Sequence, residues 1–146
     1  MKKRFNLLSV VPQAYTPMLE FDKLLADAEL DHIHREMIKI RTSQLNGCAY
    51  CLNAHTKDAL KYGEQPQRIF VLTAWREARN WFSDKEQSIL ELTEEVTLIS
   101  QHGVSGEVFD RAVELFGEKT TAQIILAIVT MNCWNRLAIS FAKHPE

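Results

Sequence analysis

The sequence contains few turn-forming residues, with five glycines and four prolines among 146 residues. No segment alternates apolar and polar residues for long enough to predict a β-strand. This lack excludes the strand–helix–strand pattern of a thioredoxin-like fold. Apolar residues instead recur at helical spacing, so the sequence predicts an all-α protein, and its length predicts one domain over residues 1–146.

A strong charge excess and a long apolar run are also absent. The formal net charge is -2, which argues against nucleic acid or an anionic membrane surface as a partner. The basic start Lys2–Arg4 precedes a short apolar stretch that Asn6 and Ser9 interrupt, unlike a secretory signal. The longest apolar run, Ile124–Val129, is too short to span a membrane. We therefore expect a cytoplasmic protein with no membrane partner.

Cysteine is scarce, and the three present are Cys48, Cys51 and Cys133. An odd, small number excludes the disulfide scaffold of a small secreted domain. Cys48 and Cys51 form a C-x-x-C pair, which in a cytoplasmic chain is typical of a catalytic, redox-sensing or metal-binding site.

Caps and helix stops divide the chain into an N-terminal arm and a series of helices. Asn46 is expected to cap the cysteine helix, and Gly63 to end it. Capping boxes are expected at Ser83–Glu86 and Thr120–Gln123. The predicted segments are an extended arm over 1–16, helices over 18–27, 30–45, 48–62 and 66–74, a helix after Ser83, one over 105–116 that Gly117 stops, and one over 122–142.

The last predicted helix is apolar on nearly all sides, with 15 apolar residues among the 21 from Ala122 to Ala142. Such a helix is either the central core helix or is partly covered by another subunit, and we expect a homo-oligomer. Cys133 is expected to be a buried, inert thiol. Within Trp134-Asn135-Arg136, the arginine either anchors an acid or marks the emergence of the helix into solvent.

The cysteine helix places three reactive side chains on one face. Cys48 and Cys51 are three residues apart, and His55 follows Cys51 by four. The helix start favours a thiolate because its free N–H groups and dipole stabilise negative charge. A histidine one turn further on can take up the thiol proton.

Glu36 is the candidate partner of His55. The two lie at similar distances on either side of Gly47, so a helix hairpin would bring them to the same depth. The carboxylate could then orient the imidazole or relay a proton. The alternative is a solvated glutamate beside Arg35 and Lys39.

Zinc is the main alternative for the cysteine pair. Cys48, Cys51 and His55 offer three ligands, and His32, His34 or Glu36 could supply a fourth. Structural zinc sites usually present a second close ligand pair, and His32 and His34 point in different directions on a helix. The sequence therefore predicts no metal and no other cofactor, with a zinc-stabilised interaction module as the alternative.

Several motifs together resemble a known family. They are Glu36-x4-Arg41-x-Ser43-x2-Asn46-Gly47-Cys48-Ala49-Tyr50-Cys51-x3-His55, then Gly63, Trp75-Arg76-Glu77 and Trp134-Asn135-Arg136-Leu137-Ala138. Over roughly residues 12–142 the chain resembles single-domain members of the alkyl hydroperoxidase D (AhpD-like) branch of the carboxymuconolactone decarboxylase family. The branch's best-described members carry a second histidine where this chain has Tyr50, and the decarboxylase branch lacks the cysteine pair.

The resemblance implies a compact all-α AhpD-like domain, a helix hairpin carrying the C-x-x-C motif, and assembly as trimers or hexamers. It also implies a thiol-dependent peroxidase acting on an organic hydroperoxide or hydrogen peroxide. Cys51 would attack the peroxide, Cys48 would resolve the sulfenic acid, and His55 with Glu36 would relay the proton.

The reductant implied is a dithiol, either a lipoyl group or a thioredoxin-like protein. Cys48 is expected to lie nearer the solvent than Cys51 and to exchange with this donor. A disulfide reductase or redox sensor on the same fold remains an alternative.

Overall fold

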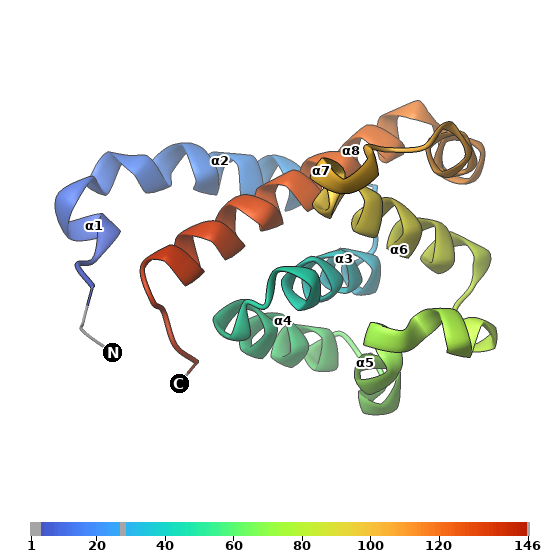
Figure 1. The fold of residues 1–146 in the computed structure, drawn as a ribbon, viewed down its shortest axis with the longest axis horizontal. Coiled ribbons are helices and arrows are strands. Elements are labelled where there is room, and N and C mark those ends of the chain that lie inside the picture. Colours follow the sequence, from blue (N-terminus) through green and yellow to red (C-terminus); the bar gives the residue numbers. More distant parts are fainter. Residues whose placement is uncertain (1–3, 27–28, 146) are drawn as a thin grey trace.

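The computed structural model describes residues 4–26 and 29–145, and over these ranges the chain is helical and contains no strand. The all-α prediction is therefore confirmed (Figure 1). The elements are α1 (Leu7–Val10), the 3-10 helix η1 (Pro12–Ala14), α2 (Tyr15–Ala26), α3 (His32–Asn46), α4 (Ala49–Lys61), α5 (Pro66–Val71), the 3-10 helix η2 (Leu72–Trp81), α6 (Asp84–Thr97), α7 (Ile99–His102) and α8 (Gly106–Ser140).

The N-terminal arm is not extended, contrary to the prediction for residues 1–16. The Asn6 side chain accepts the Leu8 N–H at 2.9 Å and caps the short helix α1, a role that asparagine fills well. Pro12 then opens η1 at a position where its missing N–H costs nothing. Residues 1–3 of the predicted arm, and residue 27 of the predicted helix 18–27, lie outside the described residues.

α3 and α4 form the predicted hairpin, and Gly47 makes the turn between them with a left-handed φ of 69°. Asn46 does not cap α4, contrary to the prediction; it is the last residue of α3, and Cys48 occupies the cap position. Asn46 instead donates hydrogen bonds to two buried asparagines of α8. α4 ends just before Gly63, which has a φ of 92° and lies in the predicted stop position.

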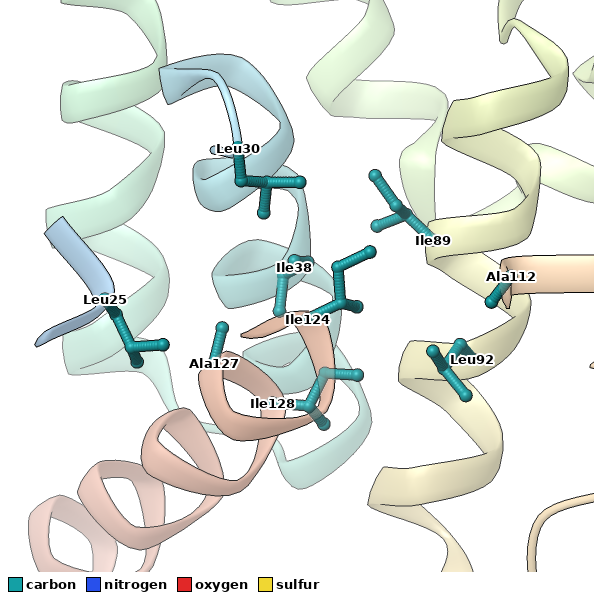
Figure 2. Packing of buried hydrophobic residues seen from close by; sticks show 9 residues of the cluster. All are labelled: Leu25, Leu30, Ile38, Ile89, Leu92, Ala112, Ile124, Ala127 and Ile128. Carbon is teal, nitrogen blue, oxygen red and sulfur yellow. The ribbon is translucent and has the colours of Figure 1, made fainter. Parts of the chain in front are cut away.

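The second half of α8 is the central core helix. Figure 2 shows it packing against α3, α6 and the end of α2, and the cluster comprises Leu25, Leu30, Ile38, Ile89, Leu92, Ala112, Ile124, Ala127 and Ile128. Fully burying an isoleucine such as Ile124 or Ile128 stabilises the fold by about 1.5–3 kcal/mol. This core fixes α8 behind the α3–α4 hairpin.

Gly117 interrupts α8 as predicted, with a φ of 75° and a ψ of 165°. The helix resumes directly after it, so Thr120 lies inside the first turn and cannot be its cap. The predicted capping box at Thr120–Gln123 is wrong, because the Gln123 Oε1 atom is buried without a hydrogen-bond partner.

An 18-residue part of α8 has a mean hydropathy of 1.3, which is apolar enough to cross a membrane, and 44% of it is buried within the protein. One face remains uncovered: Val129 is 42% exposed and Cys133 is also exposed. The prediction that Cys133 is buried is therefore wrong, because its position turns away from α3 and α6.

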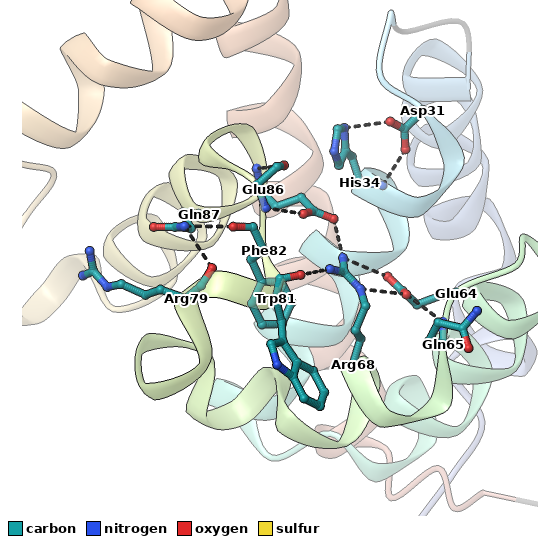
Figure 3. Close-up of polar contacts among 11 residues, drawn as sticks. Asp31, His34, Glu64, Gln65, Arg68, Arg79, Trp81, Phe82, Glu86 and Gln87 are labelled. Atoms are coloured by element: carbon teal, nitrogen blue, oxygen red, sulfur yellow. Dashed lines mark hydrogen bonds and ion pairs between the residues drawn. The ribbon is translucent and has the colours of Figure 1, made fainter.

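Polar contacts join the segments around η2 (Figure 3). Arg68 donates to Glu64 at 2.9 Å and also bonds to Glu86. Ser83 and Glu86 form the predicted capping box at the start of α6. On the other side of η2, Glu94 accepts hydrogen bonds from Trp75 and Arg41, each at 2.8 Å. The motif residue Arg41 therefore ties α3 to α6.

Candidate active site

The two cysteines of the C-x-x-C pair open α4. Their Cα atoms are 5.4 Å apart and they form a disulfide, a separation within the usual range. Cys48 is the N-cap residue, and its sulfur accepts the backbone N–H of Cys51 at 3.4 Å. The C-x-x-C pair therefore lies at disulfide distance at the start of α4.

Both cysteines are buried, with exposed fractions of 1% for Cys48 and 4% for Cys51. They share a cluster with Met131 and Ala138 of α8, against which Trp134 packs. The expectation that Cys48 lies nearer the solvent is wrong. It assumed an exposed helix start, but α8 covers the start of α4.

Glu36 and His55 are in direct contact across the hairpin. The Oε2 atom of buried Glu36 lies 2.8 Å from Nδ1 of His55, and its Oε1 atom accepts from Nζ of Lys39 at 2.7 Å. Burial acts to raise the pKa of Glu36, but the hydrogen bond from His55 and the charge of Lys39 outweigh it and lower the pKa below 4.5. Glu36 is therefore an ionised acceptor rather than a solvated surface residue.

A cavity of about 540 Å³ reaches this pair between α2, α3, α4 and α8. Cys51, His55 and Glu36 line it, whereas Cys48 does not. Its other walls are mostly apolar and aromatic, and these residues include Tyr15, Leu25, Tyr50, Tyr62, Met131, Trp134 and Leu137. Charged side chains also line it, among them Asp22, Arg35, Lys39 and Lys143. The arrangement gives an apolar molecule access to one sulfur and one imidazole.

The C-terminal segment contributes to the rim of this cavity. Lys143 Nζ donates to the Tyr15 hydroxyl at 3.2 Å and lies 5.3 Å from the ring centre of Tyr50. Tyr50 itself is 39% exposed. It is therefore a wall residue of the cavity rather than a member of the Glu36–His55 pair.

Asp22 on α2 is a cavity residue that the sequence interpretation missed. Its Oδ2 atom accepts the indole N–H of Trp134 at 3.0 Å. Burial raises the pKa of Asp22, and the Trp134 hydrogen bond and the charges of Lys39 and His55 offset this only in part. Asp22 lies beside Glu20 and Lys23 in the sequence, so nothing in the local pattern singled it out as a cavity residue.

A second missed feature is an asparagine network behind the cysteines. Asn135 is fully buried; it accepts from Asn46 at 3.0 Å and donates to the Ser43 hydroxyl at 3.0 Å. Asn46 also donates to Asn132 at 2.9 Å. Arg136 is exposed and donates to Asn132 at 2.7 Å, so the arginine is not the buried anchor. The network fixes the α3–α4 turn against α8.

Within the described part of the chain, one set of side chains is close enough to hold a metal ion: Glu36, His55 and Asp58, whose ligand atoms lie within 4.8 Å of one another. Neither cysteine belongs to it. Both oxygens of Glu36 already accept hydrogen bonds, from His55 and Lys39. A zinc site built on the cysteines therefore gains no support from this geometry.

Comparison with known proteins identifies related chains. Residues 12–95 match the Carboxymuconolactone decarboxylase family. The uncharacterised protein YdfG of Bacillus subtilis (strain 168) is 38% identical over 144 residues, covering 99% of this chain and 97% of that protein.

Two solved structures share the fold. A protein from Agrobacterium tumefaciens, described as of unknown function with a suggested antioxidant defence role as AhpD, has a TM-score of 0.93 at 29% identity and 99% coverage of both chains. The alkylhydroperoxidase AhpD core from Ralstonia eutropha JMP134, an uncharacterised peroxidase-related protein, has a TM-score of 0.80 at 23% identity, covering 95% of this chain and 74% of that one.

Proposed function

The chain belongs to the carboxymuconolactone decarboxylase family as a single-domain, AhpD-like member, and from that premise we propose that it is a thiol-dependent peroxidase. The observation that carries the proposal is the disulfide-forming pair Cys48–Cys51 beside the Glu36–His55 pair, on a cavity that reaches Cys51. Reduction of a peroxide requires a nucleophilic thiol and a group that carries the proton, and a largely apolar cavity admits an organic substrate to both.

In the oxidative step, the Cys51 thiolate attacks the terminal oxygen of the hydroperoxide. The O–O bond breaks, Cys51 becomes a sulfenic acid and the rest of the peroxide leaves as an alkoxide, which takes up a proton to give an alcohol. Cys51 is assigned this role because it lines the cavity with His55, whereas Cys48 does not.

His55 handles the proton in this proposal. The ionised Glu36 accepts a hydrogen bond from Nδ1, which places the ring proton on Nδ1 and leaves Nε2 as the basic nitrogen. Nε2 takes the proton from the Cys51 thiol and returns it to the leaving alkoxide. Lys39 supports the relay indirectly, because its charge keeps Glu36 ionised.

Cys48 then attacks the sulfenic sulfur of Cys51, and water leaves as the disulfide forms. An external dithiol must reduce this disulfide, and a lipoyl group or a thioredoxin-like protein can supply the electrons. Both sulfurs are buried, so the donor has to enter the cavity. A slender lipoyl arm suits this geometry better than the surface of a folded protein.

The size of the cavity favours an organic hydroperoxide over hydrogen peroxide. Its volume of about 540 Å³ lies in the range of small-molecule pockets and far exceeds the roughly 30 Å³ that one water molecule occupies in the liquid. Hydrogen peroxide, which is similar in size to water, would leave most of the apolar wall without a contact.

We also place the protein in the cytoplasm as a homo-oligomer, a trimer or hexamer in keeping with the resemblance. The exposed apolar face of α8 around Val129 supports the assembly, because a second subunit would remove that face from water. Reducing dithiols are available in the cytoplasm.

A disulfide reductase or redox sensor is the second candidate, because the same buried disulfide would serve it. Peroxide consumption should be followed with dihydrolipoamide, thioredoxin and glutathione in parallel, with cumene hydroperoxide and hydrogen peroxide as substrates. We expect turnover with cumene hydroperoxide and dihydrolipoamide. Disulfide reduction without peroxide turnover under all conditions would favour the second candidate.

A further inference from the structure

The two sulfurs of the disulfide differ in their access to the cavity. Cys51 lines it, whereas Cys48 does not and is the more buried of the two. A thiolate that reduces a disulfide must reach one sulfur in line with the bond that breaks. A thiol that enters the cavity can therefore reach only the Cys51 sulfur.

We infer that the external dithiol attacks Cys51 and that Cys48 is the leaving thiolate. Cys51 would thus meet both the oxidant and the reductant, while Cys48 exchanges only with Cys51. The inference rests on the dithiol chemistry of the proposed function but not on peroxide, since it begins from the disulfide however that disulfide was formed.

The local backbone supports departure of Cys48. Its sulfur accepts the Cys51 N–H at 3.4 Å, and it occupies the N-cap position of the 13-residue helix α4. An amide hydrogen bond and the positive end of a helix both stabilise a thiolate, and a better-stabilised thiolate leaves faster.

The reaction proceeds in two balanced exchanges. A donor thiolate bonds to the Cys51 sulfur, the Cys48–Cys51 bond breaks, and the electron pair leaves on Cys48. The second donor thiolate then attacks the donor sulfur of this mixed disulfide and releases the Cys51 thiolate. The donor ends as a cyclic disulfide, both cysteines are reduced, and two electrons have passed to the protein.

The test traps the mixed disulfide. Oxidised Cys133→Ala protein, which retains only the two site cysteines, is mixed with 2-mercaptoethanol, quenched in acid denaturant within seconds, and its free thiol is alkylated with a maleimide. Chymotrypsin cleaves after Tyr50 and separates the two cysteines for mass spectrometry. Acid denaturation stops thiol–disulfide exchange and makes both cysteines equally accessible to the maleimide.

We expect mercaptoethanol on Cys51 and maleimide on Cys48, in excess over the reverse pattern by about tenfold or more. The reverse pattern, or equal amounts of both, would overturn the inference. So would a disulfide that the thiol cannot open at all. Failure of the peroxidase proposal would leave this experiment unaffected, because no peroxide is used.

The route through the cavity is tested separately with two leucine substitutions on α4. Ala54 lines the cavity, whereas Lys57 is exposed and does not. Reduction of the disulfide by 2-mercaptoethanol should be slowed about tenfold in Ala54→Leu and unchanged in Lys57→Leu. Equal rates in the two variants would show that the thiol arrives by another path.

Discussion

Glu36 on α3 and His55 on α4 meet across the hairpin, with the carboxylate Oε2 atom 2.8 Å from Nδ1 of the imidazole. The contact joins a buried acid to a half-buried histidine that lines the cavity beside Cys51. In the proposed relay the ionised carboxylate accepts the proton of Nδ1, and removal of this contact is the most direct test of that relay.

Glu36→Gln should slow the reaction of the reduced enzyme with cumene hydroperoxide by about 100-fold, because a neutral amide no longer stabilises the charged imidazole. Stopped-flow measurement of the oxidation rate checks this. Glu20→Gln, an exposed change on α2, is the control and should retain the full rate. Oxidation of the Glu36→Gln cysteines by diamide should proceed normally. A wild-type rate with peroxide would remove Glu36 from the relay.

Lowering the pH should destabilise the protein partly through protonation of Glu36. Because its pKa is lowered in the folded state by His55 and Lys39 despite burial, its stabilising contribution is present above the unfolded value near 4.5 and is lost as the pH falls through the folded pKa. Thermal unfolding between pH 7 and pH 3 should therefore show a smaller loss of Tm for Glu36→Gln than for the wild type. Parallel curves would contradict this linkage.

Single cysteine substitutions should separate the oxidative roles. After one equivalent of cumene hydroperoxide, Cys48→Ser should accumulate a sulfenic acid on Cys51, since the resolving thiol is missing. Cys51→Ser should form none. A dimedone adduct read by mass spectrometry measures both outcomes, and an adduct on Cys48 with none on Cys51 would reverse the roles. No adduct in either protein would leave only disulfide exchange.

The asparagine network should matter for stability. Asn135→Ala removes the donor to the buried Ser43 hydroxyl and one of the two acceptors of the Asn46 amide. We expect a loss of about 1–3 kcal/mol in the free energy of unfolding. Arg136→Ala, an exposed change next to it, should cost about 0.5 kcal/mol or less. Urea unfolding of both variants makes the comparison, and equal losses would show that the network is not the stabilising feature.

The exposed face of α8 should control assembly. Val129→Glu places a charge on that face, and sedimentation should show smaller species than for the wild type. Ile99→Glu, on α7 and also exposed, should leave the assembly state unchanged. A wild-type protein that sediments as a monomer at micromolar concentration would contradict the proposed oligomer outright.

Local signals in the sequence predicted the hairpin and its neighbours well. Gly47, Gly63 and Gly117 each adopt the positive φ that a helix stop needs, and the Ser83–Glu86 box depends only on residues within one turn. The Glu36–His55 contact was within reach because two regular helices of known rise meet at a short turn.

Features set by distant segments could not be predicted in this way. The burial of Cys48 depends on Met131 and Ala138 of α8, which lie more than 80 residues further along the chain. Asparagine is a residue type that often caps a helix, but the Asn46 side chain donates hydrogen bonds to two asparagines of α8 instead. Local hydrogen-bonding preference is a weak guide where a buried polar partner offers a competing bond.

Arg4 holds the start of the described chain on the end of α8, donating to the Ser140 carbonyl at 2.6 Å, and Phe5 packs edge-on against Phe141. Lys143 follows directly and touches the cavity rim through Tyr15. The two ends of the described chain thus lie near each other (Figure 1), and Lys143 brings the C-terminal segment to the cavity. An affinity tag or fusion partner would extend from this region, so turnover should be measured after the tag has been removed.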